Sequence, residues 1–160
     1  MSTFNLIIQT LHNIGRWGVV ILAVIAIIRA FSGWFGKKTF TAADNKVGFL
    51  YTMALDIQVL LGLILYFSKG WFGVLTTDFG AAMSSSGTRF FAIEHLLVMI
   101  AAVAIAHIGR SQSRKAESDV KKHSRAALWY LISFIVLLAS IPWPFMANAR
   151  PWLRLFGISF

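Results

Sequence analysis

The chain contains four histidines and no cysteine. Disulfides and cysteine-held zinc or iron–sulfur sites are therefore excluded, and a metal would have to be bound through imidazole. Two of the histidines stand inside apolar stretches, His12 in "LIIQTLHNIGRW" and His95 in "RFFAIEHLLVMI". An ionisable side chain is unfavourable in such a setting and usually has a function there. His12 and His95 are thus the first candidates for chemistry.

His12 and His95 have neighbours that suit a cofactor. Helical spacing places Arg16 on the face that carries His12, with Gly15 on the same turn. Each histidine lies about seven or eight residues inside its stretch, or roughly 10–12 Å along a helix. Two imidazoles at one depth can supply both axial ligands of one haem. Gly15 would then edge the porphyrin, and Arg16 and Arg89 would pair with its propionates. The alternative is that each histidine only forms a hydrogen bond between helices.

Two carboxylates, Asp56 and Glu94, also lie in apolar stretches. Each is a candidate for proton transfer or for contact with a quinol. Asp56 could instead form a buried ion pair with Arg16 or Arg29. Glu94 points about 100° away from His95 on a helix, so it is a poor orienting group for that histidine and could pair with Arg16.

The two remaining histidines are weaker candidates. His107 follows His95 by a distance of about 18 Å along a helix, near the helix end. Its possible partner for a second haem is His123, in the charged segment "VKKHSR", which we expect to be wet. We therefore expect a single haem and interpret His107 as an interfacial residue.

Long apolar helices are needed to hold these side chains. Of the 160 residues, 58% are hydrophobic and 13% are charged, whereas a soluble domain is about a quarter charged. Four segments reach the roughly 20 residues that cross a bilayer. They are residues 4–31, 47–67, 89–110 and 126–145. Pro142 and Pro144 should end or kink the last one. The prediction is an all-α polytopic membrane protein, a four-transmembrane-helix bundle forming a single domain over residues 1–160.

The distribution of positive charge predicts the orientation. Of the 15 Lys and Arg residues, most lie between the first and second or between the third and fourth segments. Such residues collect in cytoplasmic loops, so both termini should lie on the non-cytoplasmic side. The tail "ARPWLRLFGISF" should lie on the outer surface as an amphipathic segment or contact another subunit.

Two other functional classes are not expected. The net charge of +9 follows from the basic loops, and without a recognisable nucleic-acid-binding motif we expect no nucleic acid partner. The start "MSTFNLIIQTLHN" lacks a basic region and a convincing cleavage site, so we expect the first apolar segment to be retained.

Several phrases, spread over nearly the whole chain, are specific in combination. They are "LHNIGRW", "IIRAFSGWFGKKTFTAADNK", "LLGLILYF", "DFGAAM", "RFFAIEH", "HIGRSQSRK" and "IPWPF". With them the sequence resembles a small four-helix membrane family of Bacteroidetes that is labelled "cytochrome B". The resemblance implies a b-type haem protein of the bacterial inner membrane, with His12 and His95 as the matching ligands. Members of that family often have a histidine where this sequence has Asp56, so the chain departs from the pattern there.

Three functions are compatible with these features. The leading hypothesis is a haem b electron carrier or membrane-anchor subunit between a quinol and a partner, such as another respiratory-complex subunit, rather than a complete enzyme. The second is a cofactor-free accessory subunit with an interhelical polar network of His12, Arg16, Asp56, Glu94 and His95. The third is a small proton-coupled transporter or channel using Asp56 and Glu94, which the lack of an inverted repeat disfavours.

Overall fold

The computed structural model describes residues 2–160 and is dominated by long helices. Four helical stretches are long and apolar enough to cross a membrane. They are α1 (Thr3–Phe35), α2 (Ala42–Ser68), the stretch Ser86–Arg114 that contains α6 (His95–Arg114), and α7 (Asp119–Ser140). The all-α fold and the four predicted spans are therefore confirmed.

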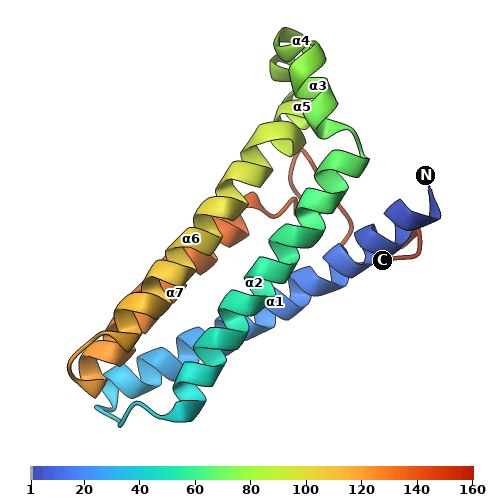
Figure 1. Cartoon of the computed structure of the whole chain (residues 1–160). Helices are drawn as coiled ribbons and strands as arrows, with labels where there is room; N and C mark the ends of the chain where they lie inside the picture. The colour runs from blue at the N-terminus through green and yellow to red at the C-terminus, as the bar shows by residue number, and fades with distance from the viewer. Residues whose placement is uncertain (1) are drawn as a thin grey trace.

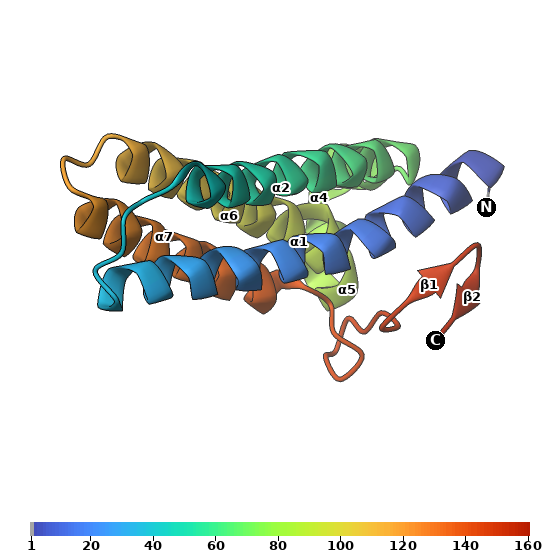
Figure 2. The same cartoon turned by 90° about the horizontal axis from the view of Figure 1, so that it is seen from below.

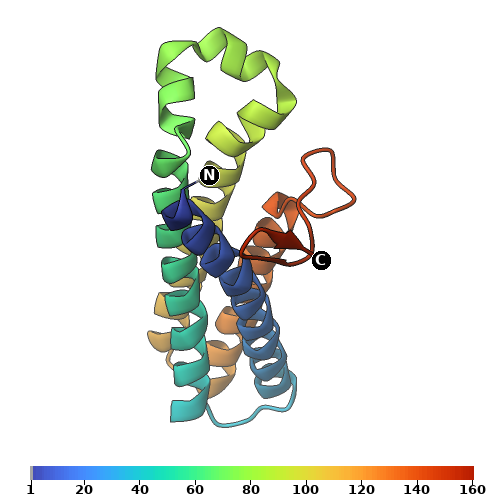
Figure 3. The same cartoon turned by 90° about the vertical axis from the view of Figure 1, so that its right-hand side faces the viewer.

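The four long helices run up and down as a bundle (Figure 1). Helix α7 packs against α6 and α1, and α2 packs against α1 and α6. The connections 36–41 and 115–118 lie at one end, which we call the loop end. Both termini lie toward the other end, the tail end, as an even number of spans requires (Figures 1 and 3). Helix α1 diverges from its neighbours toward its N-terminus, so the bundle widens toward the tail end (Figures 1 and 2).

Small residues bring the helices together in the loop-end half. A Cβ atom at Gly33 would clash with the His123 ring, and one at Gly109 would clash with Cβ of Trp129. Alanines of α1, α6 and α7 fill the core around these contacts. They include Ala23, Ala26, Ala30, Ala106, Ala126 and Ala127. Because a bilayer offers no hydrophobic drive between helices, such close backbone approach is the usual source of their association.

A buried hydrogen-bonded chain joins three helices near the middle of the bundle. The Tyr51 hydroxyl of α2 lies 2.9 Å from Oγ of Ser133 on α7. Ser133 donates in turn to the Ala102 carbonyl of α6 at 2.8 Å, so Tyr51 must donate to Ser133. Each of the three polar groups in this hydrogen-bonded series has a partner, as a position within hydrocarbon demands.

The connection between the second and third spans is helical. It folds into α3 (Trp71–Thr77) and α4 (Phe79–Ser84), and α5 (Ser86–Arg89) begins the third span; together these short helices cap the tail end (Figure 1). A π-helical turn, η1 (Phe90–Glu94), then leads into α6, and the His95 amide donates to the Phe90 carbonyl. Turns of this kind are rare in proteins, but those that occur are often found at functional sites.

The fourth span ends earlier than its predicted boundary at residue 145. Helix α7 stops at Ser140, and Ile141 adopts an extended conformation with φ −73° and ψ 126°. The reason is local, because Pro142 disfavours a helical conformation in the residue before it. The prediction that the prolines stop the helix is thus confirmed, while the boundary is wrong by a turn.

The C-terminal tail folds back onto α1. Strands β1 (Arg154–Leu155) and β2 (Ile158–Ser159) form a small antiparallel hairpin beside the N-terminal half of α1 (Figures 2 and 3). The Arg154 amide donates to Oδ1 of Asn13 at 3.0 Å, and the Phe156 amide donates to Oγ1 of Thr10 at 3.0 Å. The predicted amphipathic surface segment is therefore a hairpin held by polar residues of the first span.

The outer faces of the long helices remain apolar. Large hydrophobic side chains are exposed on each of them, among them Ile28, Leu60, Leu97 and Ile135. A continuous apolar exterior suits contact with a lipid bilayer. The chain is a multi-pass membrane protein by this criterion.

Candidate functional site

A cavity of about 190 Å³ lies inside the bundle in its tail-end half. All four long helices and the tail contribute to its walls, and the cavity is partly open on one side. Both His12 and His95 line it, together with apolar residues such as Met99 and Leu137. His12 is nine residues from the start of α1 at Thr3, and His95 is nine residues from Ser86. The structure therefore brings the two histidines to the walls of one space.

The His95 ring has a fixed tautomer. Its Nδ1 lies 2.8 Å from the Ser140 carbonyl oxygen. A carbonyl can only accept, so Nδ1 carries the proton and Nε2 retains its lone pair. This is the arrangement by which proteins orient a metal-ligating histidine.

The sequence "SIPWPF" explains why the Ser140 carbonyl is free. In a helix this oxygen would accept from the residue four positions on, which is Pro144 and has no N–H. The Leu138 carbonyl meets the same problem at Pro142, and Nε1 of Trp143 donates to it at 3.0 Å. The two prolines therefore release two carbonyls, of which one is capped by Trp143 and the other orients His95.

His12 is held against α2. A Cβ at Gly62 would come within 3.3 Å of Cε1 of His12, so glycine is what lets the ring approach this helix. Gln58 donates to the His12 carbonyl at 2.8 Å. Nδ1 of His12 is buried and has no hydrogen-bond partner within residues 2–160.

The donor set of the cavity suits a haem. Two neutral imidazoles from opposed helices are standard axial ligands, and bundle cores are common cofactor sites. A cavity of about 150 Å³ holds one benzene ring, and this one of about 190 Å³ is only slightly larger, so a porphyrin would have to extend through the open side. Residues 2–160 contain no cluster of three or more His, Cys, Asp or Glu side chains that could hold a metal ion.

Arg16 lines the same cavity, as predicted, but meets the tail. Its guanidinium donates to the carbonyls of Pro151, at 3.3 Å, and Trp152. The side chain is buried, with 9% of the residue exposed. Arg16 therefore fastens the tail to α1 beside the cavity, a role that its sequence position did not reveal.

Gly15 and Arg89 do not line the cavity. A Cβ at Gly15 would meet Oε1 of Gln58, so this glycine serves contact between α1 and α2. Arg89 binds Glu94 at 2.6 Å and donates to the Met83 carbonyl at 3.3 Å. The expected contacts of Arg89 with propionates and of Glu94 with Arg16 are therefore not present.

Asp56 pairs with His107, a contact that the sequence did not reveal. Nε2 of His107 lies 2.8 Å from Oδ1 of Asp56, and the two side chains are 46% and 51% exposed. Arg29, one of the partners expected for Asp56, instead binds Asp44 at 2.8 Å. The Asp56–His107 pair thus lies on the outer surface of α2 and α6, outside the cavity.

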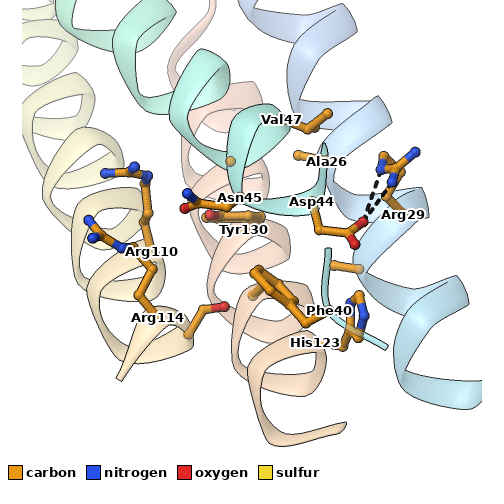
Figure 4. Close-up of a pocket in the computed structure, with 14 residues that line it drawn as sticks. Ala26, Arg29, Phe40, Asp44, Asn45, Val47, Arg110, Arg114, His123 and Tyr130 are labelled. Carbon is orange, nitrogen blue, oxygen red and sulfur yellow. Dashed lines mark hydrogen bonds and ion pairs between the residues drawn. The ribbon is translucent and has the colours of Figure 1, made fainter. Parts of the chain in front are cut away.

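A second pocket in the loop-end half contains His123 (Figure 4). Its volume is about 10 Å³, which is about the space of a single water. His123 is 2% exposed and packs on Phe40 with ring centroids 5.0 Å apart. The expectation that His123 is wet is therefore wrong, because Gly33 lets α1 cover it. His107 does not line this pocket.

The fold and the cavity define a class of protein, a multi-pass helical bundle with a histidine-lined internal site. Comparison of the chain with protein-family models, curated proteins and solved structures finds no match. The functional argument therefore depends on the geometry of the cavity.

Proposed function

We propose that the protein binds one haem b in the tail-end cavity, with His12 and His95 as the axial ligands. The observation that carries the proposal is that both histidines line one internal cavity. His95 presents Nε2 because its Nδ1–H donates to Ser140. The family resemblance points to the same two histidines.

Unpaired polar atoms favour a bound ligand over a cofactor-free polar network. Nδ1 of His12, Nε of Arg16 and Oε1 of Gln58 are buried without a partner in the described chain, and all three residues line the cavity. A network built for structure alone would pair these atoms with one another, since an unpaired buried group is destabilising. The same atoms are explained if a ligand contacts them.

The chain's own residues would hold and tune the cofactor. Haem supplies one-electron transfer when bound. Ser140 would raise the basicity of the His95 imidazole by accepting its Nδ1 proton. Met99 and Leu137 would exclude water from the cavity, and burial together with axial ligation sets the potential. The function is that of an electron carrier or anchor subunit in the bacterial inner membrane.

The surface pair Asp56–His107 supports a link to quinol. Both side chains face the region of the lipid, where a quinol diffuses, and they are joined at 2.8 Å. A quinol that loses an electron also loses a hydroxyl proton. A carboxylate–imidazole pair can accept that proton, as general bases do.

Difference spectroscopy tests haem binding. The protein, purified in detergent and supplemented with haem, should show a b-type α-band in the dithionite-reduced minus oxidised spectrum. His12→Ala and His95→Ala should each remove it, because each deletes an axial ligand. His107→Ala is the matched control and should keep the band. Absence of the band from the unsubstituted protein would refute the proposal.

A second measurement tests the quinol link. With Asp56→Asn, reduction of haem by a soluble quinol analogue should slow by about tenfold or more, because a proton acceptor is lost. Reduction by dithionite should be unchanged. Glu117→Gln removes an exposed carboxylate at the loop end and serves as the control. Equal quinol rates in the two variants would rule out a role for Asp56.

A further inference from the structure

Four cationic side chains surround the cavity. Arg16 comes from α1, Lys69 follows α2, and Arg150 and Arg154 belong to the tail. None of the residues that line the cavity, all within the described part of the chain, is acidic. The cavity wall therefore carries an excess of positive charge that the protein does not neutralise locally.

The acidic residues of the chain are engaged elsewhere. Five of the six form ion pairs with other basic side chains, and the sixth caps α4 by accepting from the Ala81 amide at 2.8 Å. They are Asp44, Asp56, Glu94, Glu117 and Asp119 in the pairs, and Asp78 at the cap. Within the described residues no side-chain carboxylate is left to neutralise the cations of the cavity.

Two of these cations are incompletely bonded in the interior. Nε of Arg16 and Nε of Arg154 are buried and lack a hydrogen-bond partner within residues 2–160. The contacts of Arg16 with the Pro151 and Trp152 carbonyls hold the group in place but leave its charge uncompensated. A buried guanidinium normally has an anionic partner.

The other two cations are positioned by neutral groups. Nζ of Lys69 donates to Oε1 of Gln9 at 3.0 Å, and the Arg150 guanidinium lies 4.4 Å from the centre of the Phe91 ring. Loss of hydration, followed by repulsion from Arg150 and Arg154, lowers the pKa of Lys69. Mutual repulsion of this kind is relieved when an anion binds between the charges.

We propose that Arg16, Lys69, Arg150 and Arg154 form an anion-binding site for the acidic end of an amphipathic ligand whose apolar body fills the cavity. The site stands on the cations and the cavity, and does not require that the ligand be haem. A haem would place its propionates there, and a fatty acid or lipid its carboxylate or phosphate. The shared chemistry is an oxyanion attached to an apolar body.

The first experiment uses a spin-labelled stearate and its methyl ester as probes. Binding near Trp71, which lines the cavity, should quench tryptophan fluorescence. The acid should bind about tenfold more tightly than the ester, which corresponds to one charge-assisted hydrogen bond. In Arg150→Gln/Arg154→Gln that ratio should fall to about one. The hairpin should survive, because Arg154 anchors it through its backbone amide.

The matched control is Lys37→Gln/Lys38→Gln, which removes the same charge at the loop end and should keep the acid-to-ester ratio. Circular dichroism should show that both double variants unfold at similar temperatures. An acid-to-ester ratio near one in the unsubstituted protein, or an equal loss of the ratio in both double variants, would overturn the anion site.

The second experiment distinguishes the sources of the anion. Haem and its dimethyl ester are added to the purified protein, and retention is read from the difference spectrum. Tighter retention of the free acid, lost in Arg150→Gln/Arg154→Gln, assigns the site to propionates. If neither form binds while the stearate keeps its preference, the haem proposal fails and the anion site stands as one for lipid acids. Equal retention of both haem forms, with no stearate preference, overturns the site.

Discussion

The two halves of the bundle handle a buried histidine in opposite ways. In the loop-end half, Gly33 lets α1 close over His123, and a space of about 10 Å³ remains beside the ring (Figure 4). In the tail-end half α1 diverges (Figure 1), and His12 and His95 line a space of about 190 Å³. Burial of an imidazole therefore does not by itself indicate a functional site. The space in front of it separates a packing residue from a candidate ligand.

The difference arises from where small residues and prolines lie. Glycines and alanines draw the helices together toward the loop end, so side chains there fill the core completely. At the tail end the prolines stop α7 at Ser140 and free a carbonyl that accepts a hydrogen bond from His95. The closely packed loop-end half, called here the closed half, thus supports the tail-end half that contains the cavity, called here the open half.

The largest expected effect on stability comes from a substitution that disrupts the close helix packing of the closed half. Gly109→Ala places a Cβ against Cβ and the backbone of Trp129, which cannot move away by a rotamer change. We expect a loss of about 1–3 kcal/mol in the free energy of unfolding, as overpacking gives. Unfolding in mixed micelles of denaturing and mild detergent measures it.

Two other glycines complete this test. Gly18→Ala meets no atom within 4 Å and should leave stability unchanged or slightly raised. Gly62→Ala meets Cε1 of His12 at 3.3 Å, beside the cavity, so the ring can yield and haem affinity should respond more than stability. Equal destabilisation by all three substitutions would show that the halves are packed alike.

The boundary between the halves should give an intermediate effect. Ser133→Ala leaves the Tyr51 hydroxyl and the Ala102 carbonyl without their partner, and we expect a loss of about 1–2 kcal/mol. Tyr51→Phe removes a single donor and should lose about 0.5–1 kcal/mol. The same unfolding assay compares them. Losses near zero for both variants would mean that side-chain packing, and not the hydrogen-bonded chain, joins the halves.

The smallest effect concerns the charge at the open half. Because the folded protein lowers the pKa of Lys69, its charged form destabilises the ligand-free fold at neutral pH. This destabilisation should fade as the pH rises through the lowered pKa toward the ordinary lysine value. Lys69→Gln should therefore raise the melting temperature slightly at pH 7 and not at pH 11. Melting followed by circular dichroism measures it, and a lower melting temperature at pH 7 would contradict the repulsion.

The helices were predictable from sequence because their signals are local. Runs of about 20 apolar residues define a span wherever they occur, and the effect of Pro142 on the residue before it is equally local. The ends were less accurate. Helix α2 begins at Ala42 because Thr41 and Asp44 form a capping box outside the apolar run, and hydropathy does not register a cap of this kind.

The site was predictable only in part. Depth along a helix can be counted, so the meeting of His12 and His95 in one space followed from their positions. The pairing of Asp56 with His107 depends on how α2 and α6 are rotated against each other, which no local pattern fixes. The contribution of Arg150 and Arg154 depends on the tail folding back onto α1.

The pairing of Arg89 with Glu94 was hidden for a different reason. Residues five apart lie about 140° apart on a regular helix, yet these two side chains meet at 2.6 Å. They do so because η1 supplies i to i+5 hydrogen bonds, which bring the fifth residue into register. A helical wheel, which places successive residues 100° apart, cannot show such a contact.

The π turn also determines how the short helices at the tail end are rotated about the helix axis relative to His95. A π turn is equivalent to one residue inserted into an α-helix, because it contains one residue more than the corresponding α-helical turn. Deleting one residue from Phe90–Glu94 would restore a regular helix and leave hydropathy nearly unchanged. Because the π turn already absorbs that extra residue, Arg89 and the short helices before it would keep their alignment with His95. The same deletion within the regular part of α6 would instead rotate the two sides of the helix by about 100° against each other.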